Sequence, residues 1–268
     1  MPTLPLPDRR AIALLLLSWA VAGCAELPRQ DLSSVMDPSV TKERFHADRL
    51  KRLEHVRQWQ VSGILEVTSH EGRRRYRTEV QGEAAQRVKV TLFGLLQQVA
   101  GILFADPDEI RMVDAEQQQI IEVPSTAAGL NHLIGIGLQP EELFESMIGL
   151  AGPVVESEEE HWLTLQGEAL YLEESGLIRE RSGQTETGDT YRVLYQWAEP
   201  GAEGEAAVPM PTQIHVLFSP GKTEVKFSGR QWQLLDQTWP DDWFTAPEAL
   251  YTEFTVDRPF SAPPRPRP

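Results

Sequence analysis

Alternation of apolar and polar residues over short segments constrains the fold of this 268-residue chain more than any other feature. It is cleanest over residues 86–92, where Val88, Val90 and Leu92 are separated by polar residues. Successive side chains of a β-strand point to opposite faces, so this pattern predicts a strand with one buried face. The same reasoning predicts consecutive strands at residues 59–68, 73–80, 86–92, 99–104, 109–114 and 118–123. Their turn-length separations predict an antiparallel meander.

Residues 124–152 interrupt the alternation and predict two short helices. Ser125 is a suitable N-cap for the first helix, which would end at Gly135. Pro140 fits the first turn of the second helix. That helix carries an apolar stripe at helical spacing, made of Leu143, Phe144, Met147 and Ile148. A stripe of this kind packs equally well against a permanent core or against a cavity that opens, and the sequence does not distinguish the two.

Strand patterns then resume at residues 161–165, 169–172, 177–181, 190–197, 213–218 and 222–232. Within residues 190–197, Tyr191, Tyr195 and Trp197 share one face and are expected to lie inside, either lining a cavity or filling a core. The charged segment 41–57 predicts a helix that covers one edge of the sheet. The predicted fold is mainly β (α+β): a curled, incomplete antiparallel β-barrel with a short helical lid and an N-terminal edge helix.

The N-terminus predicts a targeting signal. Arg9 and Arg10 precede an apolar run over residues 11–22, which is shorter than the ~20 residues that span a bilayer and suits a secretory signal. Cys24, the single cysteine of the chain, follows directly. This arrangement resembles a bacterial lipobox, so we expect cleavage before Cys24 and acylation of its thiol, with palmitate among the chains. Such an anchor holds a protein on a membrane without a spanning helix.

The composition predicts one domain with flanking segments: a signal peptide at 1–23, a flexible tether at 24–40, the sheet domain at 41–258, and a disordered Pro-rich tail at 259–268. The net charge of −15 argues against nucleic-acid binding. It also predicts that membrane contact beyond the anchor is apolar, and the basic run 73–75 is interpreted as a solvated strand face.

The sequence indicates no enzyme. Its six histidines show no metal-ligand spacing, and it has no Gly-x-Ser-x-Gly motif or Gly-rich phosphate loop. The acidic run 156–160, which precedes His161, is interpreted as a solvated turn. We therefore expect no catalytic residues, no metal and no cofactor.

Residues 49–152 resemble the LolA/LolB lipoprotein-localisation superfamily, and the lipobox makes the resemblance LolB-like. The segments that carry it are residues 59–63, Phe93-Gly94-Leu95-Leu96, Val113-Asp114, 130–135 and 143–150. The resemblance implies an unclosed β-barrel whose lid covers an apolar cavity for the acyl chains of lipoproteins. The residues assigned to lid and cavity are Leu143, Phe144, Met147, Ile148, Tyr191, Tyr195 and Trp197.

The resemblance also implies a function. The chain would be an outer-membrane lipoprotein receptor and insertase in a Gram-negative bacterium, facing the periplasm, since Ala25 rather than Asp follows the lipobox cysteine. It would accept acylated lipoproteins from a LolA-like periplasmic carrier, act as a monomer, and use Phe93, Leu95 and Leu96 as a membrane-insertion loop. The same loop residues would otherwise continue the buried strands beside them. The alternative function is a structural or scaffolding lipoprotein of the same fold that binds a protein partner.

Overall fold

The computed structural model describes residues 38–260, except residues 71, 85, 152–161, 166–167, 186–187, 199–207, 220–222 and 237. The predicted signal peptide, Cys24, most of the tether and residues 261–268 of the predicted tail lie outside the described residues. All described residues belong to one compact unit, which begins at Asp37.

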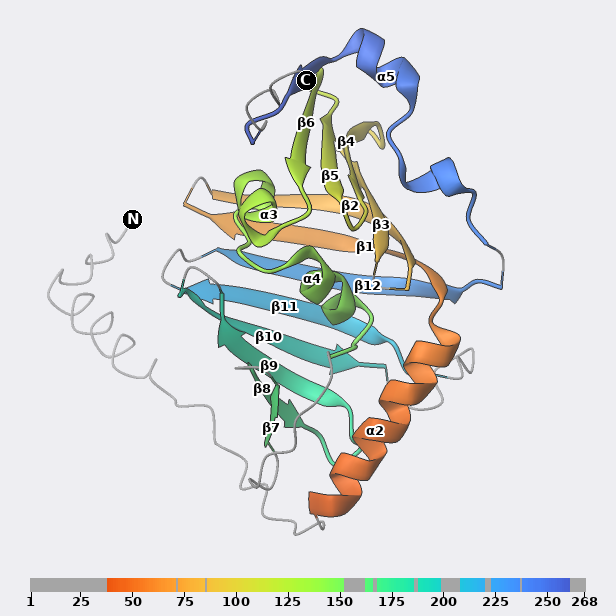
Figure 1. Cartoon of the computed structure of the whole chain (residues 1–268), viewed down its shortest axis with the longest axis vertical. Helices are drawn as coiled ribbons and strands as arrows, with labels where there is room; N and C mark the ends of the chain where they lie inside the picture. Colours follow the sequence, from red (N-terminus) through yellow and green to blue (C-terminus); the bar gives the residue numbers. More distant parts are fainter. Residues whose placement is uncertain are drawn as a thin grey trace, which may run out of the picture. The chain divides into compact units, whose positions relative to one another are not determined.

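Runs of strands alternate with helices, of which α2 is the longest (Figure 1). The order is α2 (Pro38–His55), β1 (Gln58–Ser69), β2 (Gly72–Glu83), β3 (Arg87–Phe93), β4 (Val99–Ala105), β5 (Glu109–Asp114), β6 (Gln119–Pro124), α3 (Ala127–Ile134), α4 (Pro140–Met147), β7 (Trp162–Leu165), β8 (Glu168–Leu172), β9 (Ile178–Gln184), β10 (Thr190–Trp197), β11 (Pro211–Ser219), β12 (Glu224–Leu234), the 3-10 helix η1 (Asp241–Phe244), α5 (Glu248–Glu253) and β13 (Thr255–Asp257).

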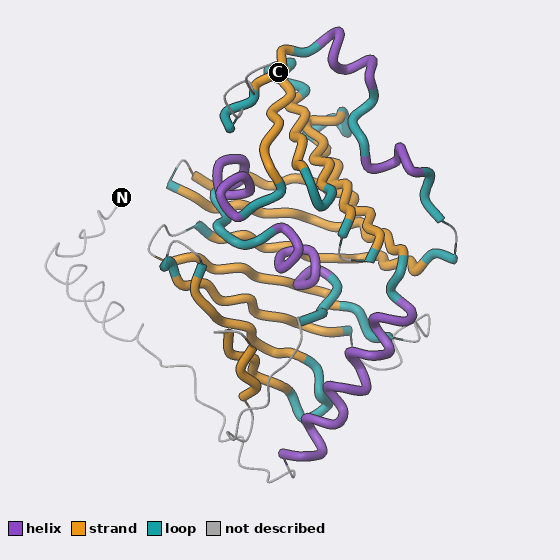
Figure 2. The backbone as a smooth tube through the Cα atoms, in the orientation of Figure 1, coloured by secondary structure: helices purple, strands orange, loops and turns teal. Residues whose placement is uncertain are grey.

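The strands of the described residues form one curled sheet in the order β13-β6-β5-β4-β3-β2-β1-β12-β11-β10-β9-β8-β7. Strand β1 joins the two halves because it pairs with β2 on one side and with β12 on the other. Neighbouring strands are antiparallel except for the parallel pair of β13 and β6. The sheet does not close, and α3 and α4 cover its concave face (Figures 1 and 2). The predicted fold class is confirmed.

The helix boundaries follow local chemistry. Thr126, not Ser125 as predicted, is the N-cap of α3, because its hydroxyl accepts a hydrogen bond of 3.2 Å from the amide of Gly129. Gly135 ends α3 in the left-handed conformation, with φ of 71°, as its position predicted. Helix α4 begins at Pro140, where the missing amide proton costs no helical hydrogen bond.

The C-terminal segment, residues 239–257, has structure that the sequence pattern does not predict. Helices η1 and α5 lead to β13, which extends the sheet beyond β6. A second apolar cluster forms with this segment and contains Phe104, Ile120 and Ala246. The indole of Trp243 donates a hydrogen bond of 3.0 Å to the side chain of Gln81 on β2. These elements are too short to show periodicity, which is why the pattern missed them.

Candidate acyl-chain cavity and exposed turn

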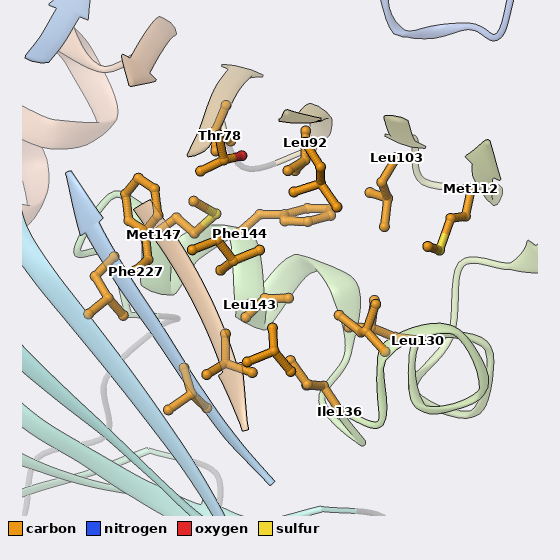
Figure 3. Close-up of a pocket in the computed structure, with 18 of the residues that line it drawn as sticks. Thr78, Leu92, Leu103, Met112, Leu130, Ile136, Leu143, Phe144, Met147 and Phe227 are labelled. Atoms are coloured by element: carbon orange, nitrogen blue, oxygen red, sulfur yellow. The ribbon is translucent and has the colours of Figure 1, made fainter. Parts of the chain in front are cut away.

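A cavity of about 150 Å³ lies between the concave face of the sheet and helices α3 and α4 (Figure 3). Seven adjacent strands, from β5 to β11 in the sheet order, contribute to its wall. The residues that line it are Leu65, Val67, Thr78, Val80, Val90, Leu92, Ile102, Leu103, Met112, Leu130, Ile134, Ile136, Leu143, Phe144, Met147, Ile214, Val216, Val225 and Phe227.

The wall of the cavity is chemically apolar. Thr78 is the single polar residue among those lining it, and its hydroxyl donates a hydrogen bond of 2.9 Å to the carbonyl of Thr91. No charged side chain lines the cavity. An apolar wall of this kind offers water few hydrogen-bonding partners, so it suits an apolar guest better than a polar one.

Helix α4 supplies the part of the wall that faces the sheet. Leu143, Phe144 and Met147 point toward the cavity from α4, and Leu130 does so from α3 (Figure 3). Ile148 follows the helix and is completely buried, but it is not part of the lining. Of the four stripe residues, three thus meet at the cavity and the fourth packs beside it.

Two buried arginines hold α4 in place. The guanidinium of Arg181, on β9, donates hydrogen bonds of 3.1 Å to the hydroxyl of Ser146 and 3.3 Å to the carbonyl of Glu142. Arg52, on α2, donates one of 3.0 Å to the carbonyl of Ile148. These charge-assisted hydrogen bonds connect α4 and the residue after it to β9 and α2, so an outward movement of α4 has to break them.

Three predicted cavity residues lie elsewhere. Tyr191, Tyr195 and Trp197 are on β10, and none of them lines the cavity. The rings of Tyr195 and Trp197 stack with centroids 5.7 Å apart, and the guanidinium of Arg52 lies 4.7 Å from the Trp197 ring centroid. The indole of Trp197 donates a hydrogen bond of 2.8 Å to the carbonyl of Ile178. Tyr191 and Tyr195 belong to the buried core beyond β11, and Trp197 packs against it.

The turn between β3 and β4 exposes apolar side chains. Leu95 is fully exposed and 87% of Leu96 is exposed, while Val99 is 41% exposed. The turn is closed by a hydrogen bond of 2.9 Å from the amide of Gly94 to the carbonyl of Gln98. Two consecutive exposed leucines are unusual in a turn, where polar residues are expected.

Phe93 differs from the two leucines. It is the last residue of β3 and is half-buried. Leu92, its neighbour in sequence, lines the cavity. The exposed turn and the cavity wall are therefore continuous along β3.

The described residues contain no other obvious chemistry. Within them, no group of three or more His, Cys, Asp or Glu side chains is placed to hold a metal ion. No helix in this part of the chain is long and apolar enough to cross a bilayer.

The fold is shared with a DUF1329 family protein. That protein, from Desulfovibrio piger ATCC 29098, matches over 78% of this chain and 98% of its own, with a TM-score of 0.50 and 6% sequence identity. The LolA superfamily protein NE2245 from Nitrosomonas europaea matches over 79% and 99%, with a TM-score of 0.47 and 12% identity. A candidate outer membrane lipoprotein-sorting protein domain from Vibrio parahaemolyticus matches over 78% and 96%, with a TM-score of 0.48 and 6% identity. No protein-family model and no curated protein matches the sequence.

Most of the cavity wall was not singled out from the sequence. The strand residues Val90, Leu103, Met112 and Phe227 line the cavity, and they carry the alternation that predicted the strands. That alternation places them on the inner face of the sheet. It contains no sign of which inner residues meet a lid and which meet a filled core.

Proposed function

We propose that this protein binds the acyl chains of lipoproteins in the cavity beneath α3 and α4 and releases them into a membrane. The single observation that carries the proposal is the apolar cavity, whose wall offers an acyl chain no polar partner and no charge. The resemblance of residues 49–152 to the LolA/LolB superfamily supports lipoproteins as the source of that chain. A scaffolding lipoprotein would have no need of this space, which favours acyl binding over the scaffolding alternative.

The size of the cavity implies that the helices move. A cavity of about 150 Å³ accommodates a guest of roughly benzene size. A long acyl chain needs more room, and α3 and α4 are the parts of the wall that are not held in the sheet. In this proposal α4 swings outward as the chain enters, and Leu143, Phe144 and Met147 move with it.

The direction of transfer follows from burial alone. Each methylene that leaves water for an apolar site contributes ~0.8 kcal/mol, so a chain moves spontaneously toward the site that buries it most completely. The bilayer buries it completely, whereas the cavity does so only in part. No cofactor or energy source is then required between a soluble carrier, this protein and the membrane.

In this proposal the acyl chain is released into the membrane at the exposed turn between β3 and β4. Leu95 and Leu96 would enter the bilayer interface next to the strand that lines the cavity. Together with the acylation expected at Cys24, this supports a receptor and insertase on the periplasmic side of the outer membrane, supplied by a LolA-like carrier. Phe93, half-buried at the base of the turn, would support the turn rather than enter the lipid.

The test is an acyl-binding titration of the full chain carrying Cys24→Ser, a change that prevents the protein's own anchor from occupying the cavity. A long-chain fatty acid with an environment-sensitive fluorophore is titrated and then displaced by a diacylated cysteine peptide. We expect saturable binding that the peptide reverses. Absence of saturable binding would overturn the proposal.

A cavity-filling variant locates the site. Leu103→Trp places an indole in the space between β4 and α4 and should weaken binding by at least about tenfold, because the guest and the ring compete for one volume. Leu50→Trp makes the same change on the exposed face of α2, where 65% of the leucine is exposed, and should leave binding unchanged. Equal binding by the two variants would place the site outside this cavity.

A further inference from the structure

A stripe of arginines runs along the outer face of β2. Arg73, Arg75 and Arg77 alternate with residues of the inner face, where Thr78 and Val80 line the cavity. All three arginines are exposed. In a chain with a net charge of −15, this is a local concentration of the opposite sign.

The register of the sheet brings this stripe to the exposed turn. Arg77 is paired with Phe93, the residue that leads into the turn. Arg75 lies two residues further along β2, a step of roughly 7 Å. A small hollow of about 90 Å³ at the base of the turn is lined by Ser62, Arg77, Thr78, Glu79, Phe93 and Gln97. Arg77 thus lies directly beside the turn.

The acidic neighbours of the stripe are already engaged. Glu66 on β1 accepts a hydrogen bond of 2.6 Å from Arg73, and this contact lowers the pKa of its carboxyl group. Glu79 accepts one of 2.8 Å from the amide of Gln81. Glu66 also lies opposite Arg75 in the pairing of β1 with β2, and the charge of Arg75 contributes to lowering the pKa of its carboxyl group. Among the described residues the ion pair of Glu66 is with Arg73. The charge of Arg77 is therefore available to a partner, and that of Arg75 is shared in part with Glu66.

The vertical spacing fits a bilayer surface. Leu95 and Leu96 lie two and three residues beyond Phe93, a reach of up to roughly 10 Å. Apolar side chains of interfacial proteins are buried about 5–10 Å into the boundary between headgroups and acyl chains. When the leucines are inserted to that depth, Arg77, which is level with Phe93, lies at the height of the lipid phosphates. Arg75 lies beyond Phe93 on the same side as the leucines, and its long side chain can extend back to the phosphates. A guanidinium matches a phosphate with two parallel hydrogen bonds.

We propose that Arg75 and Arg77 bind the phosphate headgroups of an anionic phospholipid bilayer and, with Leu95 and Leu96, dock this end of the sheet on the membrane. The inference rests on the proposed function only for the role of the turn. It replaces the expectation, drawn from net charge alone, that contact beyond the anchor is purely apolar. The bilayer is favoured over an acidic protein because the arginines lie beside exposed leucines, and Arg77 is level with the base of their turn.

The test places an environment-sensitive fluorophore on the turn. The full chain carries Cys24→Ser and Leu96→Cys, so the label has a single attachment site. Vesicles of phosphatidylcholine are compared with vesicles that also contain phosphatidylglycerol. We expect a blue shift of the fluorophore with tighter binding to the anionic vesicles, and we expect the difference to disappear at high salt.

The paired variants assign the effect to the stripe. Arg75→Gln with Arg77→Gln should weaken binding to anionic vesicles by about tenfold or more, since each arginine near such a surface contributes roughly fivefold. Arg57→Gln with Arg179→Gln removes the same charge from exposed positions at the opposite end of β1 and on β9, and should have little effect. Arg75→Lys with Arg77→Lys keeps the charge but loses the forked guanidinium, so it should bind more tightly than the glutamine variant and less tightly than the parent protein. This partial recovery excludes misfolding as the cause.

Each outcome separates the two proposals. Equal binding by the stripe and control variants, with acyl binding intact, overturns the headgroup assignment alone. A fluorophore that shifts with neither vesicle overturns the membrane role of the turn as well. If the stripe variant binds vesicles normally but no longer accepts cargo from an acidic carrier, the stripe is a protein-docking surface and the headgroup assignment is wrong.

Discussion

The two ends of the concave face differ in how their space is used. Beneath α3 and α4 the inner side chains of the strands are mostly aliphatic and leave a cavity. Beyond β11 the same face carries the buried Tyr191 and Tyr195 and the half-buried Trp197, on which Arg52 of α2 is stacked. These side chains pack into the core, and we call this part of the face the filled end. Both ends belong to one sheet and share one alternation. The elements that cover the sheet, and not the strand pattern, therefore determine which end contains a cavity.

The boundary between the two ends falls between neighbouring strands. Val193 on β10 and Val216 on β11 are directly paired, and both are buried. Val216 lines the cavity and Val193 does not. A step of one strand thus separates space for a ligand from permanent core, and this pair offers a direct comparison of the two.

The largest effect is expected from removing the buried cation of the filled end. Arg52 has a fully buried side chain, and its guanidinium lies 2.5 Å from Asp48. Arg52→Met leaves the Asp48 carboxylate and the Ile148 carbonyl without their donor, and should lower the free energy of unfolding by about 3 kcal/mol. Urea denaturation measures it. The exposed Arg57→Met is the control, with a change within about 0.5 kcal/mol.

An Arg52→Met variant as stable as the control would mean that the filled end does not depend on this contact. Burial lowers the pKa of the Arg52 guanidinium, while Asp48 opposes that shift. Burial of Arg52 therefore costs desolvation free energy, and the ion pair and hydrogen bond with Asp48 offset it. The difference in unfolding free energy between Arg52→Met and Arg57→Met measures the net effect.

The paired valines provide the second test. Val193→Leu adds a methylene to a packed core and should destabilise the protein by about 1–3 kcal/mol. Val216→Leu adds the same group to a wall with free space beside it, so its cost should be well below that of the first variant. Thermal or urea unfolding of the two variants side by side gives the difference. Equal destabilisation by the two variants would show that side chains move into the cavity in solution and fill it.

The sequence predicts the fold better than the site because the two depend on different information. Alternation along β3 identifies Val88, Val90 and Leu92 as inner residues, and the structure places them there. Whether an inner residue meets a cavity depends on what packs across from it, which involves residues far away in the sequence. Arg181 is an example, because nothing in its local sequence indicates that it reaches α4.

The exposed turn shows the opposite case. Leu95 and Leu96 stand where a turn is expected to be polar, so their exposure is visible locally as a departure from the usual pattern. The C-terminal segment gives no such signal, since β13 has only three residues. Its place in the sheet is set by pairing with β6 and by the apolar cluster on that side.

A smaller effect is expected at the contact that holds α4 to β9. Ser146→Ala removes the hydroxyl that accepts from Arg181 and should cost about 1 kcal/mol of stability. Because the contact lies on the proposed lid, its loss should also raise amide hydrogen exchange in α4 and speed release of the acyl probe. The exposed Ser219 on β11 gives a control, since Ser219→Ala should change neither. Faster exchange throughout the sheet instead would indicate global destabilisation.

The smallest effect is expected far from the cavity, in the C-terminal segment. The pKa of Tyr251 is raised from an ordinary value of 10.0 to about 12. The largest cause is burial, and a hydrogen bond to Glu122 and repulsion from its charge add to it. The folded state therefore keeps the proton more tightly than the unfolded state, so this contribution is present below about pH 10 and is lost as the pH rises toward 12.

Fluorescence of the stacked pair Trp239 and Trp243 in the same segment reports this loss, since their ring centroids lie 5.0 Å apart. Tyr251→Phe has no phenolic proton, so the change in stability between pH 10 and 12 should be smaller in that variant than in the parent protein. Acyl-probe affinity in the same range should be the same for both, because no residue of the C-terminal segment lines the cavity. A loss of probe affinity that follows the titration of Tyr251 would mean that the apolar cluster of the C-terminal segment and the lid are coupled through the sheet. The two faces of the sheet would then unfold and bind as one cooperative unit.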